Sequence, residues 1–408
     1  MEFWVDKERA QYKSYEDLIF AINEKTSISK YIYCSNPYDV VIELLASLAY
    51  GVQVEILDGD FSLEEIKYLG IKEEELAYKY EIKTKKLQNI DEYLKSIKDC
   101  KSWSLTIYTS GTTGRPKKVQ YTFESLTRNI RHEEYFKKNI WAFAYNLSHF
   151  AGLQVFLQAF LNKNPIIYLF ESNRINFEEI MNEYSCTHIS ATPTFYRNII
   201  PYIKEPLLKV SSITMGGEKF DNGLVDKLRV FFPSAKIHNI YASTEAGSLF
   251  SGCGEYFEIS EKLKPLIKIS ENSELLLHKS LVNNLELRDE WYNTKDIVEL
   301  VGENRIRFLA RSSDMINVGG YKINPLEIEE EIQKIDGVID VAISSRENKL
   351  IGNLLIADII KVDTVSEYDL KRRIVQNLNS KLQKFKIPRI INFVEKIEKT
   401  RTGKKVRT

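Results

Sequence analysis

The sequence predicts an α/β protein: a large N-terminal domain of helix-covered mixed sheets, a small β subdomain, and a small α+β domain at the C-terminal end. Three observations support this prediction. Strand-like and helix-like segments alternate up to residue 241, which is typical of sheets covered by helices. From about residue 254, short strand-like segments follow one another without long helices. After Asp314, helix-like and strand-like segments alternate again in a compact stretch.

The large domain opens with a strand–helix–strand unit at residues 31–34, 38–50 and 52–57. Residues 71–101 are rich in Lys and Glu, and they predict a solvated connection with helical pieces. The alternation then resumes. The expected strands are 105–108, 141–145, 166–170, 187–191, 213–214 and 236–241, and the expected helices are 123–135 and 152–161.

The pattern changes twice more along the chain. Strands at 274–278 and 306–309 indicate the β subdomain. The C-terminal stretch has expected helices at 325–335 and 368–382 and expected strands at 338–344 and 353–359. These changes place a domain boundary at 311–314, between a large domain at 1–311 and a small domain at 314–408.

Composition excludes several classes of protein. Lys+Arg and Asp+Glu both count 57, and this balance argues against binding nucleic acid through a basic face. The most apolar stretch, residues 141–161, is interrupted by five polar residues, so we expect it in the core and not across a membrane. The four cysteines are far apart and lack CxxC spacing. They predict neither a zinc site nor a disulfide framework, and they favour a cytoplasmic protein.

The strongest motif is YTSGTTGRPKK at residues 108–118, directly after an expected strand. Its glycines allow a phosphate to approach the backbone closely, and consecutive N–H groups can form an anion-binding nest. The common NTPase loop, GxxxxGK[ST], does not fit, because Pro116 stands where that motif needs glycine. The alternative is a polar surface turn, which does not require so many hydroxyl and glycine residues. The candidate phosphate-binding residues are Thr109, Ser110, Gly111, Thr112, Thr113, Gly114 and Lys117.

TSGTTGRPK resembles the phosphate loop of the adenylate-forming superfamily, which includes acyl-CoA synthetases, firefly luciferase and the adenylation domains of peptide synthetases. Further segments resemble family motifs in the expected order, so the resemblance covers nearly the whole chain. They are residues 44–58 (helix–glycine–strand), 146–153 (PLxHxxGL, with Asn146 for Pro), 216–218 (GGE), 241–247 (YGxTE), 292–296 (YxTGD, with Lys295 for Gly), 311–329 (GRxDDxIxxxGxxIxxxEIE) and 399–404 (KTxxGK). The segment before the phosphate loop is shorter than in most relatives, which predicts a trimmed start of the large domain.

The resemblance implies ATP and Mg²⁺ as cofactors and a carboxylic acid as substrate. Catalysis of this reaction rests on positioning and charge neutralisation. The implied roles are as follows: Thr244 contacts the α-phosphate, Glu245 holds Mg²⁺, Tyr241 stacks on adenine, Gly216, Gly217 and Glu218 line the adenine edge, Asp296 and Arg311 bind the ribose, Lys404 bridges the α-phosphate and the carboxylate, and His149 forms a wall or gate of the acyl pocket.

The resemblance also implies a second half-reaction, in which a mobile C-terminal lid delivers a thiol. The hinge position, usually Asp or Lys in the family, is Ser313 here. Gly319 and Gly320 would let a pantetheine arm pass, and the acceptor is coenzyme A or the phosphopantetheine of a carrier protein. A hinge requires tolerance of backbone change and not a particular charge, so rotation is still expected.

Several alternatives stay open. In the simplest interpretation the candidate residues have no catalytic role: Glu245 is a surface residue, Asp296 a turn residue, His149 a core histidine, Gly319–Gly320 a tight turn and Lys404 one cation of a basic tail. For the chain as a whole, one alternative is a catalytically idle nucleotide- or acyl-binding protein. A further alternative is an amino-acid-adenylating enzyme that serves a carrier protein. Peptide-synthetase domains place an Asp near the position of Asn146, and the sequence offers no acid beside it, which favours an acid without an amino group.

Overall fold

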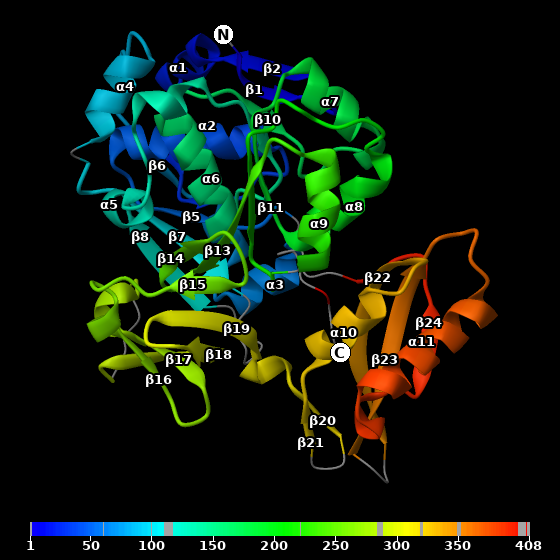
Figure 1. Ribbon diagram of the computed structural model, residues 1–408. Coiled ribbons are helices and arrows are strands. Elements are labelled where there is room, and N and C mark those ends of the chain that lie inside the picture. The colour runs from blue at the N-terminus through cyan, green and yellow to red at the C-terminus, as the bar shows by residue number, and fades with distance from the viewer. Residues whose placement is uncertain are drawn as a thin grey trace.

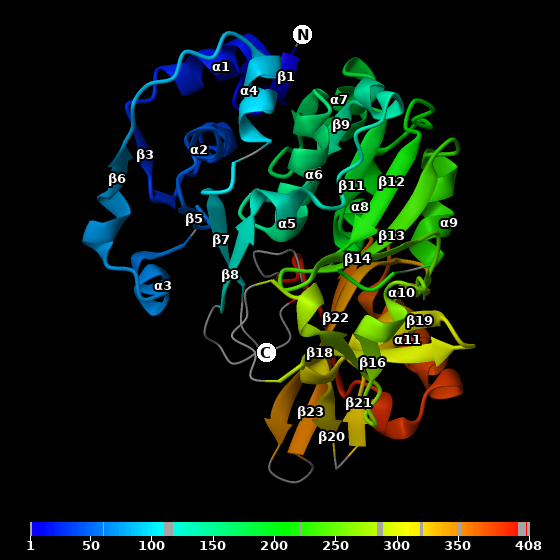
Figure 2. The same ribbon diagram turned by 90° about the vertical axis from the view of Figure 1, so that its left-hand side faces the viewer.

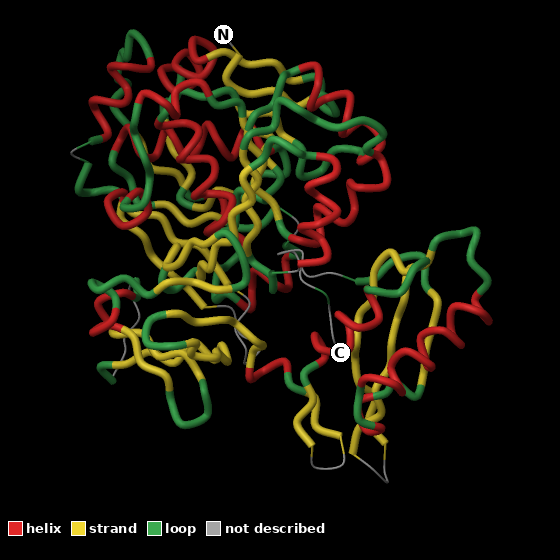
Figure 3. The backbone as a smooth tube through the Cα atoms, viewed as in Figure 1, coloured by secondary structure: helices red, strands yellow, loops and turns green. Residues whose placement is uncertain are grey.

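The computed structural model describes residues 2–59, 61–98, 100–109, 117–220, 222–283, 289–318, 321–348, 352–398 and 405. A large domain carries the β subdomain below it, and the small C-terminal domain lies beside both (Figure 1). The tube view shows long helices concentrated in the large domain and in the small domain, with mostly strands in the β subdomain (Figure 3). The predicted fold class is confirmed.

The main sheet of the large domain has eight strands, and its inner strands run parallel. Inner parallel strands are covered on both faces, so they need continuous apolar runs, as in the fully buried WAF of β9 and IIY of β10. The strands in sheet order are β14 (Gly247–Gly252), β13 (Lys236–Ser243), β12 (Ser212–Gly216), β11 (His188–Ala191), β9 (Trp141–Phe143), β10 (Ile166–Tyr168), β1 (Glu2–Asp6) and β2 (Gln11–Ser14). The antiparallel edge strands β14 and β2 were not predicted.

A second sheet holds the predicted strand–helix–strand unit. Helix α2 (Pro37–Tyr50) joins two of its parallel strands, and it begins where Asn36 caps the Tyr38 N–H at 2.9 Å. The helix ends at Gly51, whose φ of 69° is the left-handed conformation that favours glycine. The strands in order are β4 (Tyr31–Ile32), β5 (Val54–Ile56), β7 (Ser104–Thr109) and β8 (Lys117–Thr122). A short ladder pairs β3 (Ser27–Ser29) with β6 (Lys79–Glu81).

Helix α6 (Phe150–Leu161) lies between the two sheets (Figure 2). Its buried side chains join one hydrophobic core with β1, α2 and β7. Phe156 and Phe160 are fully buried and stack on each other at 5.8 Å. The apolar stretch is therefore core, as predicted, and among the described residues no helix has the length and apolar character to span a bilayer.

The other helices of the large domain are short. The predicted helix at 123–135 ends early, at Thr127. The side chains of Arg128 and Asn129, which follow it, donate to the backbone carbonyl oxygens of Ala246 and Ser248. The α-helices are α1 (Tyr15–Asn23), α3 (Leu63–Tyr68), α4 (Ile90–Ile97), α5 (Phe123–Thr127), α7 (Phe177–Glu183), α8 (Pro193–Ile199) and α9 (Asn222–Phe231). The 3₁₀ turns are Glu73–Ala77, Glu134–Lys138, Arg174–Asn176 and Ile200–Tyr202.

The β subdomain is a five-stranded antiparallel sheet. Two of its strands were expected, whereas the eleven-residue β18 was not, because its polar residues hide the alternating pattern. The strands in order are β15 (Tyr256–Glu258), β19 (Arg305–Arg311), β18 (Trp291–Val301), β17 (Glu274–His278) and β16 (Ile267–Ile269). The 3₁₀ turns are Lys264–Leu266 and Lys279–Leu281.

The small domain has a hydrophobic core of its own, formed by two helices packed on a three-stranded sheet. Helix α10 also contacts the large domain: the Glu330 carboxylate of this helix lies 2.6 Å from the Lys219 ammonium. The elements are the turn Ser312–Asp314, β20 (Ile316–Val318), β21 (Tyr321–Ile323), α10 (Pro325–Gln333), β22 (Val338–Asn348), β23 (Gly352–Lys361), α11 (Glu367–Lys381), the turn Lys384–Lys386 and β24 (Ile390–Phe393). The predicted helices and strands of this domain are confirmed, with ends shifted by a few residues.

Candidate active site

A cavity of about 1490 Å³ is lined by the large domain and the β subdomain. Four of the predicted motif segments contribute predicted site residues to its wall. These residues are His149, Gly216, Gly217, Thr244, Glu245 and Arg311, and Asn146 lines the cavity in the same turn as His149. Predicted residues that are up to 162 positions apart in the chain therefore face one space.

Sheet topology explains why these segments meet. Strands β9, β11, β12 and β13 are parallel neighbours, so their carboxyl ends lie along one edge of the sheet. The chain that leaves this edge provides Asn146 after β9, Thr192 after β11, Gly217 after β12 and Thr244 after β13. Ligands of open α/β sheets bind at this edge as a rule.

The turn at 146–149 forms one wall of the cavity. The Asn146 Oδ1 accepts hydrogen bonds from the Ser148 backbone N–H at 2.9 Å and from the Ser148 hydroxyl at 3.0 Å. Its amide nitrogen lies 3.4 Å from both carboxylate oxygens of Asp58. The His149 Nε2 lies 3.5 Å from the Asp58 Oδ2. The turn is thus held at both ends by the same carboxylate.

Asp58 is the site residue that sequence reasoning missed. It follows β5 in the second sheet, is 4% exposed, and lines the cavity. The statement that no acid lies near Asn146 was wrong in space, although no acid is adjacent in sequence. The missed signal was the position of Asp58 directly after a predicted parallel strand, where side chains reach the ligand edge.

Gly152 in the first turn of α6 allows this wall to form. A Cβ atom at Gly152 would lie 2.0 Å from the Asn146 carbonyl oxygen, so no side chain fits. We predict that Gly152→Ala destabilises the fold by roughly 1–3 kcal/mol, the usual range for overpacking. Urea unfolding measures this effect, with Gly254→Ala as control, since nothing lies within 4 Å of Gly254. Equal stability of the two variants would contradict the close approach.

Asp296 and Arg311 are paired across strands β18 and β19, where they are direct neighbours in the register. The Arg311 Nε donates to the Asp296 Oδ1 at 2.8 Å, and the Tyr241 hydroxyl donates to the Asp296 Oδ2 at 2.6 Å. Burial opposes the charged guanidinium, but the Asp296 carboxylate outweighs it and raises the pKa of Arg311. Burial, followed by the negative charge of Asp296, raises the pKa of Tyr241.

The ring of Tyr241 stacks on Phe308, with centroids 3.9 Å apart and planes at 13°. One face of Tyr241 is therefore occupied by protein, and adenine stacking on the other face stays a prediction. Asp296 is 7% exposed and lies within β18. It is therefore a buried strand residue, whereas the alternative interpretation expected a residue of a simple turn.

Lys295 has a φ of 65°, in the left-handed region. This is the position where YxTGD has glycine, the residue that adopts this conformation at the least cost. The Asn293 side chain stabilises it by accepting a hydrogen bond from the Lys295 N–H at 2.8 Å. The Lys295 ammonium lies 3.7 Å from Glu274, and its side chain is half exposed.

Thr244 and Glu245 lie in the turn between β13 and β14. Burial, and then the charge of Glu245, raise the pKa of Tyr292. Glu245 is therefore close to a second cavity residue. The described residues include no group of three or more His, Cys, Asp or Glu suited to a metal ion. A hard Mg²⁺ ion at Glu245 would take its other ligands from phosphate and water oxygens.

We predict that Glu245→Gln raises the Mg²⁺ concentration needed for half-maximal activity, because a neutral amide is a weaker ligand for a hard dication. A Mg²⁺ titration of the initial rate measures this shift at saturating ATP. Glu299→Gln, on the exposed side of β18, is the control. If both variants give the wild-type titration curve, Glu245 does not bind the metal.

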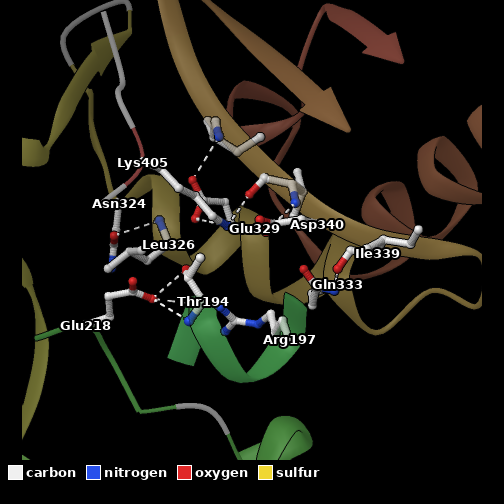
Figure 4. Close-up of polar contacts among 12 residues, drawn as sticks. Thr194, Arg197, Glu218, Asn324, Leu326, Glu329, Gln333, Ile339, Asp340 and Lys405 are labelled. Carbon is white, nitrogen blue, oxygen red and sulfur yellow. Dashed lines mark hydrogen bonds and ion pairs between the residues drawn. The ribbon is translucent and has the colours of Figure 1, made fainter. Parts of the chain in front are cut away.

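Glu218 is turned towards helix α8. Its carboxylate accepts hydrogen bonds from the Thr194 N–H at 3.1 Å and the Thr194 hydroxyl at 2.8 Å, and lies 3.9 Å from Arg197 (Figure 4). Glu218 thus stabilises the N-terminus of α8. Of the predicted adenine-edge residues, Gly216 and Gly217 line the cavity.

Part of the predicted site lies outside the described residues. This applies to Ser110, Gly111, Thr112, Thr113 and Gly114, to the side chains of Thr109 and Lys117, to Gly319 and Gly320, and to Lys404. Their roles stay predictions. Ser313 lies in the short turn between the β subdomain and β20, and its hydroxyl donates to Asp314 at 3.0 Å. Its role as a hinge is likewise not tested by this geometry.

A cavity at the carboxyl edge of a parallel sheet, lined by Thr244, Glu245 and the Arg311 of an Asp–Arg pair, is the arrangement expected of the adenylate-forming class. The chain belongs to the AMP-binding enzyme family: the family model matches residues 62–267, and the model of the AMP-binding enzyme C-terminal domain matches residues 327–404. The resemblance to the adenylate-forming superfamily is thereby confirmed.

Curated relatives are similar to the chain in sequence. The 2-succinylbenzoate–CoA ligase of Listeria monocytogenes serotype 4b is 27% identical over 342 residues, which cover 74% of this chain and 69% of the ligase. Bacitracin synthase 3 of Bacillus licheniformis is 25% identical over 345 residues, but the match spans only 5% of that protein.

Solved structures show the same fold. The o-succinylbenzoate CoA synthetase MenE of Bacillus subtilis, in complex with its acyl-adenylate intermediate, superposes with a TM-score of 0.72 at 19% identity, covering 100% of this chain and 94% of that one. ATP-bound MatB of Rhodopseudomonas palustris superposes with a TM-score of 0.73 at 16% identity, covering 99% and 94%. At these identities the likeness concerns the fold. MenE of Bacillus subtilis has also been solved in complex with ATP and magnesium ion. Family and fold together make this chain an AMP-binding enzyme of the adenylate-forming class.

Proposed function

We propose that the chain activates a small carboxylic acid as acyl-AMP and transfers the acyl group to coenzyme A. The observation that carries this proposal is the single cavity lined by Thr244, Glu245 and Arg311 together with Asn146 and His149. The first three residues suit a nucleotide and its metal ion. The turn at 146–149 offers a separate wall for the acid.

In the first half-reaction a carboxylate oxygen attacks the α-phosphorus, and the bond from that phosphorus to the bridging oxygen breaks. Pyrophosphate leaves with the electron pair. In the second half-reaction the sulfur of coenzyme A attacks the acyl carbon, AMP leaves, and the thiol proton passes to solvent. The proposed work of the protein is to orient the groups and to neutralise charge, with Arg311 and Thr244 as donors and with Lys404 as a further donor in the first half-reaction only.

Coenzyme A is preferred as acceptor because the relatives that share two thirds of their length with this chain are named as coenzyme A ligases. The same names make 2-succinylbenzoate the first acid to test. A carrier protein is the alternative acceptor, because the chain also matches a peptide synthetase, bacitracin synthase 3.

Asp58 favours a second candidate substrate, an acid that also carries an amino group. A buried carboxylate attracts a cation or a hydrogen-bond donor and repels a second anion. The Asp58 oxygens lie on the cavity wall beside Asn146 and His149. An ammonium group on the acid would meet them there, in place of part of their present contacts.

ATP–pyrophosphate exchange with a panel of acids tests both candidates. The panel contains 2-succinylbenzoate and the matched pairs propionate with β-alanine and benzoate with 3-aminobenzoate. Exchange that depends on one of the plain acids supports the first candidate. A preference for the amino member of a pair, lost in Asp58→Ser, supports the second.

An idle binding protein gives no exchange with any acid, although it still binds ATP. The acceptor is then tested by single turnover of the preformed acyl-AMP with coenzyme A and, separately, with a phosphopantetheinylated carrier protein. Faster loss of acyl-AMP with coenzyme A supports the proposal. Faster loss with the carrier alone corrects the acceptor, and no effect of either thiol contradicts the second half-reaction.

A further inference from the structure

Lys405 is held inside the small domain, at the C-terminal end of the described chain. Its side chain is only 10% exposed, and its ammonium lies 2.7 Å from the Asp340 Oδ1. The same ammonium lies 3.7 Å from the Glu329 Oε2 and donates to the Val341 carbonyl oxygen. Figure 4 shows Lys405 together with Glu329 and Asp340 beside helix α10. A lysine in a surface tail would instead keep its ammonium in water.

The two acids are buried and have fixed positions. Asp340 is 1% exposed and Glu329 is 6% exposed. Asp340 at the start of β22 accepts from the Val341 N–H at 2.9 Å, and Glu329 on α10 accepts from the Ile343 N–H at 2.8 Å. Buried carboxylates require compensating charge and hydrogen bonds. Lys405 supplies positive charge to both of them.

The helix that carries this anchor also contacts the large domain. Glu330, the residue after Glu329, pairs with Lys219 at 2.6 Å. Asn324, which caps α10, donates to the Leu309 carbonyl oxygen at 3.3 Å. Helix α10 and its cap therefore contact both Lys405 and the domain that lines the cavity. Figure 4 shows Glu218 and Thr194 of that domain next to the helix.

Lys405 directly follows Lys404, so a trans peptide bond keeps their Cα atoms about 3.8 Å apart. Only residues 399–404 separate Lys405 from Glu398, the last described residue of the preceding segment. A fixed Lys405 therefore limits the positions that its neighbour Lys404 can take. Ordering the backbone of one residue costs about 1–2 kcal/mol, so less ordering is required when Lys404 acts.

We propose that Lys405 is a positioning residue for adenylation: its ion pairs with Asp340 and Glu329 fix the backbone at residue 405 so that Lys404 is presented to the reacting groups. This proposal rests on the proposed function, in which Lys404 bridges the α-phosphate and the carboxylate. Lys405 itself does not touch substrate. Its loss should slow formation of acyl-AMP and leave the second half-reaction, which does not use Lys404, unchanged.

The first test compares Lys405→Met with the wild-type chain in both half-reactions. ATP–pyrophosphate exchange is measured with the panel acid that the wild-type chain exchanges fastest, and transfer is measured from the matching synthetic acyl-AMP to coenzyme A. We expect exchange to fall roughly tenfold to 10²-fold, the effect of a small misplacement, with transfer unchanged. Lys381→Met is the matched control, because Lys381 pairs with Glu331 in the same domain at 2.8 Å but is nearly half exposed.

A second test separates positioning from simple charge compensation. The triple variant Lys405→Met, Glu329→Gln, Asp340→Asn removes the buried charges together, and both amides can still accept the backbone hydrogen bonds. We expect this variant to fold and to exchange as slowly as Lys405→Met. Lys405→Arg, which keeps the charge, should recover most of the exchange rate.

Three results would overturn the proposal. They are wild-type exchange in Lys405→Met, an equal loss of exchange and transfer in Lys405→Met, and recovery of exchange in the triple variant. The last two would make Lys405 a structural residue only. A wild-type chain without exchange, in contrast, would contradict the proposed function, and the inference would fall with it.

Discussion

Replacing Lys404 by alanine is expected to slow the formation of acyl-AMP by about 10²-fold or more, the scale for removing one charge-stabilising donor. Negative charge accumulates where the acid carboxylate approaches the α-phosphate, and a lysine that contacts both groups offsets it. The motif KTRTGK places Lys404 at this point by resemblance. The rate of acid-dependent ATP–pyrophosphate exchange measures the loss.

The other properties of the Lys404→Ala variant should stay close to those of the wild-type chain. ATP should still bind, because the predicted phosphate loop and the cavity belong to the large domain. Lys396→Ala removes an exposed lysine from the same end of the chain, and this control should exchange at the wild-type rate. If Lys404→Ala does so too, the C-terminal lysine has been assigned the wrong role.

Much of the site was predictable because its motifs follow strands that were themselves recognisable. The apolar run 141–145 predicted a buried strand, and 236–241 was expected as the strand before the motif at 241–247. The role of Thr244 came from the resemblance of that motif to the family. The structure then places Thr244 and Asn146 at one edge of the sheet, because residues that follow parallel strands meet there.

Asp58 and Glu218 show where this reasoning stops. The contact between Asp58 and Asn146 joins two sheets and spans 88 residues, and no local pattern records how two sheets pack. Glu218 lies in a recognised motif, yet its carboxylate accepts hydrogen bonds from the N–H and the hydroxyl of Thr194 at the start of α8. Motif membership predicted the segment correctly but not the direction of the side chain.

The buried position of Lys405 was unpredictable for another reason. Lys405 belongs to a run of cationic residues at 399–407, and this run suggested a solvated tail. Its partners, Glu329 and Asp340, come from a helix and a strand of the small domain that become neighbours only in the folded domain. The strand β18 was missed because polar residues that serve the site, such as Asn293 and Asp296, interrupt its apolar face.

The second large effect is expected for Asp296→Ala. The substitution leaves Arg311 and the Tyr241 hydroxyl without the carboxylate that accepts from both at 2.8 and 2.6 Å. Removing one partner of a buried ion pair costs about 3–5 kcal/mol, and the value is smaller here, about 2–3 kcal/mol, because the Arg311 side chain is 35% exposed. Urea unfolding measures this loss of stability.

The same variant should also bind ATP poorly, because the predicted ribose site consists of Asp296 and the guanidinium that it orients. We expect the KM for ATP in the exchange assay to rise roughly tenfold to 10²-fold, since hydrogen bonds to charged groups contribute about 1.5–3 kcal/mol each.

Asp296→Asn, which keeps the size and one acceptor, should recover more stability than ATP affinity. Glu299→Ala is the control on the same strand pair, where an exposed carboxylate binds Arg307, and it should change stability by less than about 1 kcal/mol. An Asp296→Ala variant that loses stability but keeps the wild-type KM for ATP would make the Tyr241–Asp296–Arg311 cluster a structural feature and move the ribose site elsewhere in the cavity.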